Sequence, residues 1–172
     1  LTEAVKNGDI DMTNINMNIS FKGYDARHIK GFLMSSNYAG IADEMKKIGF
    51  IGAGNMASAI AGGIISSGIA SPSEIIIFDK NISQYSKFDS GCIRAINLVD
   101  LVTNSDYVFF SIKPQNIKEI LTEIKPLNIK DKVFVSICAG ITISSIESIL
   151  GNIKIIRTMP NTPLMIGEGV TA

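Results

Sequence analysis

The feature that most constrains the fold is a glycine-rich turn, Gly52-Ala53-Gly54-Asn55-Met56-Ala57, set between an apolar strand and a helical segment. This context is what gives the pattern G-x-G-x-x-A its meaning. Gly52 allows the tight turn, and Gly54 has no Cβ that would keep a pyrophosphate from the backbone. The N–H groups of Asn55 and Met56 then face the phosphates, with the helix dipole behind them. The turn predicts a dinucleotide site, against the alternative of a glycine turn that only packs.

From residue 46 onward, strands and helices alternate. Short apolar runs predict strands at 47–51, 74–78, 93–96, 107–112, 132–137 and 153–158. Apolar residues at helical spacing predict helices at 56–67, 98–103, 116–124 and 144–150. Strands without clean polar alternation, joined by helices, indicate a parallel sheet that is covered on both faces. Right-handed crossovers make residues 45–172 an α/β, Rossmann-type, doubly wound domain with a mostly parallel sheet.

The composition argues against several other classes of protein. Lys and Arg number 16, as do Asp and Glu, so the formal net charge is zero and no nucleic-acid partner is expected. No apolar run approaches the roughly 18 residues of a transmembrane helix, so no membrane partner is expected. Cys92 and Cys138 cannot form a disulfide framework, and with His28 as the only histidine no metal site is expected. These features predict a soluble cytoplasmic protein.

Residues 1–44 differ from the rest of the chain, because they are polar and rich in asparagine. Apolar and polar residues alternate over 14–22, which predicts one half-buried strand. The chain begins with Leu1, so we expect this leader to be an extension, or the tail of an upstream reading frame with Met45 as the start. A docking or regulatory strand is the alternative. No basic start precedes a continuous apolar run, so no signal peptide is expected.

Two residues after the second expected strand bear on the choice of dinucleotide, and they disagree. The carboxylate of Asp79, 27 positions after Gly52, would accept a hydrogen bond from a free ribose 2′-hydroxyl and repel a 2′-phosphate. The ammonium of Lys80 would instead attract that phosphate as a point charge, unless it is only a solvated loop charge. The choice between NADH and NADPH stays open at this point.

Three further segments follow the fourth, fifth and sixth expected strands: Ser111–Gln115, Ser136–Thr142 and Arg157–Pro163. Together with Gly49–Met56 they resemble pyrroline-5-carboxylate reductase, in their order and in their separations. The resemblance covers residues 46–172, and its most specific part runs from Met159 to Pro163. All four segments lie where expected strands end, which is where open α/β sheets bind ligands.

These segments supply further candidate cofactor-binding residues. Pro114 ends its strand and fixes a turn, so the backbone at Ile112–Lys113 can line the cofactor groove. Ala139 and Gly140 form a small wall suited to a flat nicotinamide ring. Asn161 lies between two prolines, and its amide can both donate and accept hydrogen bonds. The resemblance implies that the last two segments face the nicotinamide and the substrate.

The resemblance also implies a reaction, the reduction of (S)-1-pyrroline-5-carboxylate to L-proline by hydride from NADPH or NADH, the last step of proline biosynthesis. In that family a helical second domain follows, forms the dimer and supplies most of the substrate pocket. No sequence up to Ala172 corresponds to that domain, so it is expected to be absent here. We therefore expect a feeble or inactive chain, a homo-oligomer only with that domain, and no assignable catalytic residue.

Two other functions fit the glycine turn. A non-catalytic regulatory module would sense a nicotinamide cofactor through the same turn, but it would need no nicotinamide-side pocket. Another dehydrogenase, of the 3-hydroxyacid type or a deazaflavin-dependent NADP reductase, would share the turn, but residues 159–163 are not expected there. We expect Cys138 to be a small buried thiol, because no histidine follows His28 to activate it. Arg157 either pairs with a carboxylate or points at the ligand.

Overall fold

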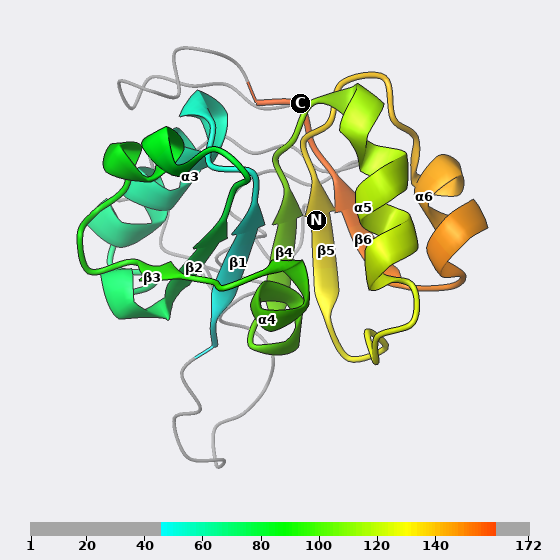
Figure 1. Ribbon diagram of the computed structural model, residues 1–172, viewed down its shortest axis with the longest axis horizontal. Helices are drawn as coiled ribbons and strands as arrows, with labels where there is room; N and C mark the ends of the chain where they lie inside the picture. The colour runs from blue at the N-terminus through cyan, green and yellow to red at the C-terminus, as the bar shows by residue number, and fades with distance from the viewer. Residues whose placement is uncertain (1–45, 161–172) are drawn as a thin grey trace, which may run out of the picture.

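The strands of the protein pair in parallel throughout the part that the structure, a computed structural model, describes, namely residues 46–160 (Figure 1). The strands are β1 (Ile48–Ile51), β2 (Ile75–Phe78), β3 (Ile93–Arg94), β4 (Tyr107–Phe110), β5 (Val133–Ser136) and β6 (Lys154–Arg157). Their order is β3-β2-β1-β4-β5-β6. The chain therefore winds outward in one direction from β1 and then in the other direction from β4. This order confirms the predicted doubly wound sheet, and the described strands are all parallel.

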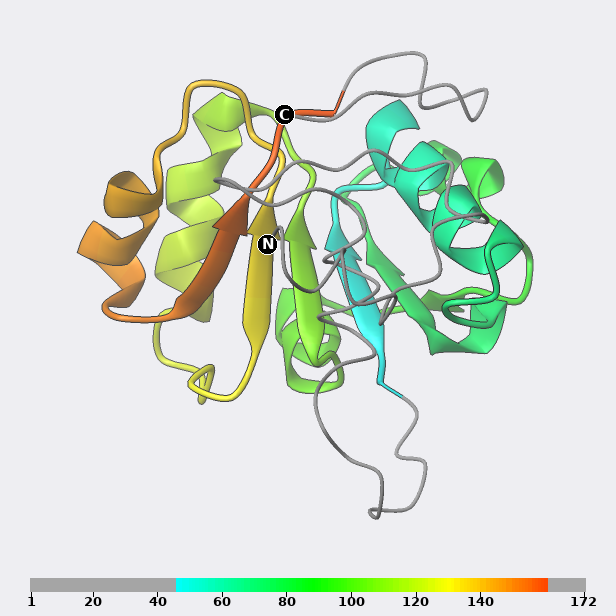
Figure 2. The same ribbon diagram turned by 180° about the vertical axis from the view of Figure 1, so that it is seen from behind.

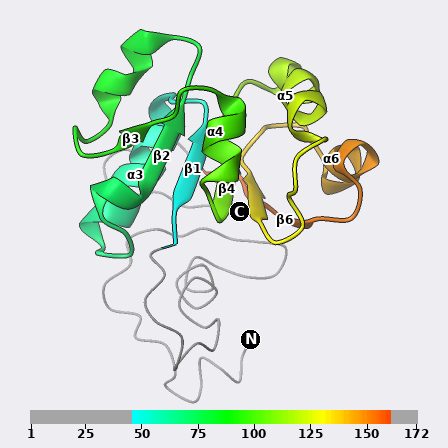
Figure 3. The same cartoon turned by 60° about the horizontal axis from the view of Figure 1, so that its bottom comes forward.

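Four α-helices connect these strands, together with three short 3₁₀ helices. The α-helices are α3 (Asn55–Ser66), α4 (Leu98–Thr103), α5 (Ile117–Ile124) and α6 (Ile143–Leu150). The 3₁₀ helices are η1 (Pro72–Glu74), η2 (Ile82–Lys87) and η3 (Pro114–Asn116). Helix α3 covers one face of the sheet, and α4, α5 and α6 cover the other (Figures 1 and 2). Seen from below, α3 lies toward β2, whereas α5 and α6 lie toward β6 (Figure 3).

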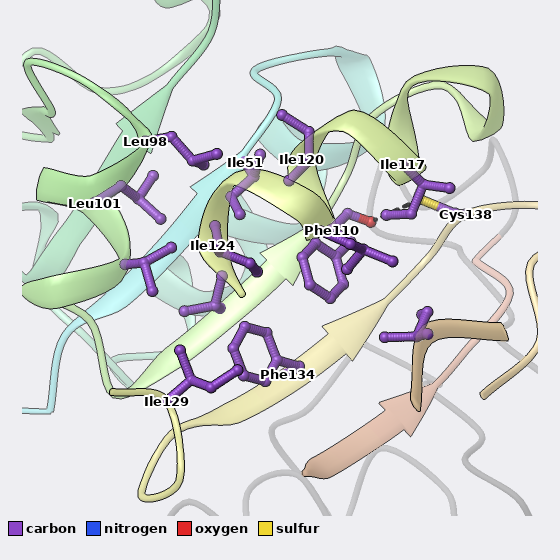
Figure 4. Close-up of a cluster of buried hydrophobic side chains, with 14 of the residues drawn as sticks. Ile51, Leu98, Leu101, Phe110, Ile117, Ile120, Ile124, Ile129, Phe134 and Cys138 are labelled. Atoms are coloured by element: carbon purple, nitrogen blue, oxygen red, sulfur yellow. Dashed lines mark hydrogen bonds between the residues drawn. The ribbon is translucent and has the colours of Figure 1, made fainter. Parts of the chain in front are cut away.

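The central strands are apolar throughout because both of their faces are buried. Every residue of β1, β4 and β5 is buried. On the α4–α6 face, Phe110 and Phe134 stack with ring centroids 5.3 Å apart and an interplanar angle of 10° (Figure 4). On the α3 face, Phe50 stacks on Phe109 at 4.7 Å. These two apolar layers hold the carboxyl ends of β1, β4 and β5 in fixed relation to one another.

The predicted elements are confirmed in type and order; β1 and β2 end where predicted, and β3 to β6 end one or two residues earlier. The strand predicted at 93–96 has only two residues. Ile96 lies beyond it and is 87% exposed, so its side chain does not pack in the core. The 3₁₀ helices were not predicted, because a single turn has no apolar periodicity. The predicted strand at 14–22 lies outside the described residues, and the predicted domain boundary at residue 45 stays a prediction. Within residues 46–160, no helix is long and apolar enough to cross a membrane.

Candidate cofactor-binding site

The glycine turn lies at the carboxyl end of β1, beside the end of β4, where the winding of the sheet reverses. Gly52 has φ +97°, a conformation that favours glycine. A Cβ at Gly52 would lie 2.5 Å from the carbonyl oxygen of Ser111. The Ser111 hydroxyl lies within hydrogen-bond distance of the carbonyl oxygens of Ile51 and Gly52, at 2.9 and 2.8 Å. Packing within the chain therefore accounts for a glycine at position 52.

Packing within the chain does not account for the glycine at position 54. Gly54 is the N-cap of α3, has φ −71°, and a Cβ built there would meet no atom within 4 Å. The first N–H groups of an α-helix, here including those of Asn55 and Met56, have no intrahelical partner, and no capping side chain or acidic residue of the first turn compensates them in α3. This open space at the N-terminus of α3 fits a pyrophosphate, which would accept hydrogen bonds from these N–H groups.

Asp79 joins the end of β2 to the glycine turn. Its Oδ2 accepts a hydrogen bond from the backbone N–H of Ala53 at 2.7 Å, and its Oδ1 accepts one from the N–H of Asn81 at 2.8 Å. The N–H of Asp79 donates to the phenol oxygen of Tyr85, at 2.9 Å. The carboxylate therefore shapes the turn itself, and its predicted contact with the ribose remains a prediction.

The two lysines beside this loop have different partners. The ammonium of Lys80 forms an exposed salt bridge with Glu119 on α5, at 2.8 Å, and this hydrogen bond is the main reason that the pKa of Lys80 is raised. The ammonium of Lys87, in η2, instead donates to Asn55 Oδ1 and Gln84 Oε1, both at 2.6 Å. Lys87 was not among the residues selected from the sequence, because 32 positions separate it from Asn55.

The loops after β4 and β5 are tied together by a buried thiol. Cys138 Sγ donates toward the carbonyl oxygens of Phe110 and Ile112, at 3.4 and 3.3 Å (Figure 4). Cys138 is 2% exposed, which confirms the predicted buried thiol, and this burial is the main cause of the raised pKa of the thiol. Pro114 begins η3 directly after Lys113, whose side chain is exposed.

The loop after β5 contains the predicted nicotinamide wall. Ala139 and Gly140 are exposed, Gly140 has φ +73°, and a Cβ on Gly140 would meet nothing within 4 Å. Arg157 Nε donates to the carbonyl oxygen of Ile141 at 2.7 Å, so this arginine supports the loop from β6. Among residues 46–160 no salt bridge joins Arg157 to a carboxylate, and its predicted orientation toward the ligand stays a prediction.

The structure thus brings together most of the predicted site residues at one edge of the sheet. Asn161 lies outside the described residues. Asn97 caps α4, because its Oδ1 accepts from the N–H of Asp100 at 2.8 Å. In the described part of the chain, no group of three His, Cys, Asp or Glu side chains is placed to hold a metal ion.

A glycine turn between a strand and a helix, at the switch point of a doubly wound parallel sheet, is the arrangement of a dinucleotide-binding domain of the Rossmann type. Comparison with known families narrows this class. The family model described as NADP oxidoreductase, coenzyme F420-dependent, matches residues 47–140. The chain belongs to that family.

Similar proteins carry a more specific name. The pyrroline-5-carboxylate reductase of Arabidopsis thaliana is 38% identical over 133 residues, which cover 76% of this chain and 48% of the relative. A reductase structure from Coxiella burnetii superposes with a TM-score of 0.69 at 32% identity, covering 74% of this chain and 48% of that one. A reductase from Plasmodium falciparum with NADP bound gives a TM-score of 0.65 at 30% identity, covering 74% and 47%. The chain spans about half the length of the curated relatives it matches.

Proposed function

We propose that this chain is the cofactor-binding part of a pyrroline-5-carboxylate reductase, which reduces (S)-1-pyrroline-5-carboxylate to L-proline in proline biosynthesis. The similarity to reductases of that name supports this substrate over the substrates of other dehydrogenases. The observation that carries the proposal is the open space at Gly54, at the start of a helix that has no side-chain cap and no acidic residue in its first turn. A turn that only packed would give Gly54 a neighbour that excludes a Cβ.

The described residues have separate tasks in this reaction. NADPH or NADH, when bound, supplies the hydride that reduces the imine carbon, and the ring nitrogen gains a proton. The N–H groups of Asn55 and Met56 hold the pyrophosphate, and the backbone at Ile112–Lys113 lines the groove beside it. Ala139 and Gly140 would offer the nicotinamide ring a small wall, which would help to position it against the substrate ring.

We assign no contact with the substrate to any of residues 46–160. The described loops supply the cofactor face, so we propose that contacts to the substrate and the proton donor come from residues beyond this range. We also propose that full activity and dimer formation require a helical second domain, as the resemblance implies. The two free thiols, Cys92 and Cys138, are compatible with the proposed cytoplasmic location.

The proposal is tested by supplying the second half of a reductase. Residues 46–172 of this chain would be joined to the second half of the Arabidopsis relative, and NADPH oxidation and proline formation would be measured with pyrroline-5-carboxylate. We expect one proline for each NADPH oxidised, and no turnover in the matched chimera carrying Gly54→Val. A folded chimera that binds NADPH but forms no proline would contradict the reductase and favour the regulatory module.

A further inference from the structure

We propose that Lys87 is the residue that recognises the 2′-phosphate of the cofactor and makes the site prefer NADPH to NADH. This inference rests on the proposed cofactor site and adds its specificity. The sequence pointed to Lys80, which follows Asp79, as the lysine that attracts this phosphate. We assign the role instead to Lys87, which the fold brings to the same site from η2.

The contacts of Lys87 leave its charge available for an anion. Its ammonium donates to two neutral amide oxygens, Asn55 Oδ1 and Gln84 Oε1, both at 2.6 Å. Among residues 46–160, no carboxylate lies within salt-bridge distance of this ammonium. Asn55 is also the first residue of α3, whose N-terminus carries partial positive charge. The Lys87 ammonium and the N-terminus of α3 are both positive, so an anion bound between them would be attracted by both.

Lys80 is in a different electrostatic position. Its ammonium already pairs with the Glu119 carboxylate at 2.8 Å, and the nearby charge of Glu123 also contributes to raising its pKa. Binding a phosphate through Lys80 would bring that phosphate toward two carboxylates. Lys87 has no salt-bridge partner among the described residues, and the carboxylate of Asp79, at the end of β2, already accepts hydrogen bonds from the N–H groups of Ala53 and Asn81, so Lys87 is the better phosphate ligand.

The position of η2 distinguishes the 2′-phosphate from the pyrophosphate. In doubly wound folds the adenosine ribose lies at the end of β2, and the pyrophosphate lies over the start of the first helix. Tyr85, two residues before Lys87, bonds to the backbone of Asp79 at the end of β2. Lys87 therefore reaches Asn55 from the ribose side of the turn. A second cation, the Arg94 guanidinium, lies 4.9 Å from the Tyr85 ring centroid and adds positive charge to this corner.

The experiment measures dissociation constants of the full 172-residue chain for NADPH and NADH by nicotinamide fluorescence, with 2′,5′-ADP as a competitor that carries the 2′-phosphate without the pyrophosphate. The variants are Lys87→Gln, the charge-preserving Lys87→Arg, Lys80→Gln, and the matched control Lys130→Gln, which removes an exposed charge before β5. We expect Lys87→Gln to weaken NADPH and 2′,5′-ADP by about tenfold or more. NADH binding should stay within about twofold, and Lys87→Arg should retain the preference for NADPH.

Each alternative outcome has a distinct meaning. Equal weakening of NADPH and NADH by Lys87→Gln would place the ammonium on the pyrophosphate and overturn the assignment. A selective loss of NADPH in Lys80→Gln, with none in Lys87→Gln, would overturn it in favour of Lys80. A wild-type chain that is folded but binds neither dinucleotide would contradict the proposed function as well. Loss of NADPH in Lys130→Gln would show that the effect is one of net charge, and would also overturn it.

Discussion

Ser111 packs against Gly52 and bonds to its carbonyl oxygen at the point where the winding of the sheet reverses. The Ser111 hydroxyl lies 2.8 Å from the carbonyl oxygen of Gly52, and the Ser111 carbonyl oxygen lies where a Cβ on Gly52 would come within 2.5 Å. The N–H of Gly52 donates to the carbonyl oxygen of Phe78 at 2.8 Å. The ends of β1, β2 and β4 are therefore joined through one glycine, and the cofactor turn depends on that junction.

Replacing Gly52 by alanine should destabilise the chain strongly. The variant combines a positive φ with a backbone clash that cannot be relieved by a rotamer, so we expect a loss of about 2–4 kcal/mol in the free energy of unfolding. Gly68→Ala is the matched control, because Gly68 has φ +69° but open space around its Cβ position. It should lose only about 1 kcal/mol in urea unfolding. Equal losses in the two variants would contradict the role given to Ser111.

Replacing Ser111 by alanine removes the hydroxyl that ties β4 to the turn. We expect a loss of about 1 kcal/mol in the free energy of unfolding, because the carbonyl oxygens of Ile51 and Gly52 lose a donor. Cofactor affinity should fall as well, since the turn is less well held. Ser66→Ala, which removes an exposed hydroxyl at the end of α3, should change stability by less than about 0.5 kcal/mol. Identical unfolding of both variants would count against the tie.

Replacing Asp79 tests whether its carboxylate shapes the turn. Asp79→Ala leaves the N–H groups of Ala53 and Asn81 without their acceptor and should cost about 1.5–3 kcal/mol. Asp79→Asn keeps one oxygen as an acceptor, so its unfolding free energy should lie between those of the alanine variant and the wild type. Urea unfolding measures both changes. If Asp79→Ala weakened only cofactor binding, and left stability unchanged, the carboxylate would act on the ribose alone.

The pH dependence of stability should carry the signature of Cys138. Burial raises its pKa above the ordinary value of 9.0, so folding favours the protonated thiol. The stability that this thiol contributes is fully present below its unfolded pKa, and is lost as the pH rises through the raised folded pKa. Urea unfolding between about pH 7 and about pH 10 should therefore show a steeper loss for the wild type than for Cys138→Ala. Parallel curves would mean that the thiol ionises equally in both states.

The predictable part of the fold is the part in which neighbours in sequence determine the structure. Residues 75–77 are three isoleucines in a strand whose faces are both buried, and such a run predicts a central parallel strand without further information. The glycine turn was predictable for the same reason, because the local pattern G-x-G-x-x-A marks a tight turn between a strand and a helix, as β1 and α3 show. Helix α4 was predicted with its observed bounds, 98–103.

The unpredicted part depends on contacts between distant residues. Lys87 reaches Asn55 across 32 positions from a 3₁₀ helix, and nothing in its local sequence distinguishes it from a solvated lysine. Asp79 was predicted as a ribose ligand from its position after β2, whereas its two backbone partners follow from the folding of the turn. Arg157 supports the loop at Ile141, a backbone contact that no side-chain pattern predicts.

The most direct test of the account is to titrate the 172-residue chain with NADPH and to compare it with Gly54→Val. Nothing lies within 4 Å of the Cβ position at Gly54, so the variant should fold, with a loss of at most about 1 kcal/mol in the free energy of unfolding from the weaker N-cap. We expect saturable binding by the wild type and loss of binding in this folded variant. Equal binding by the two proteins, or no binding by a folded wild type, would contradict it.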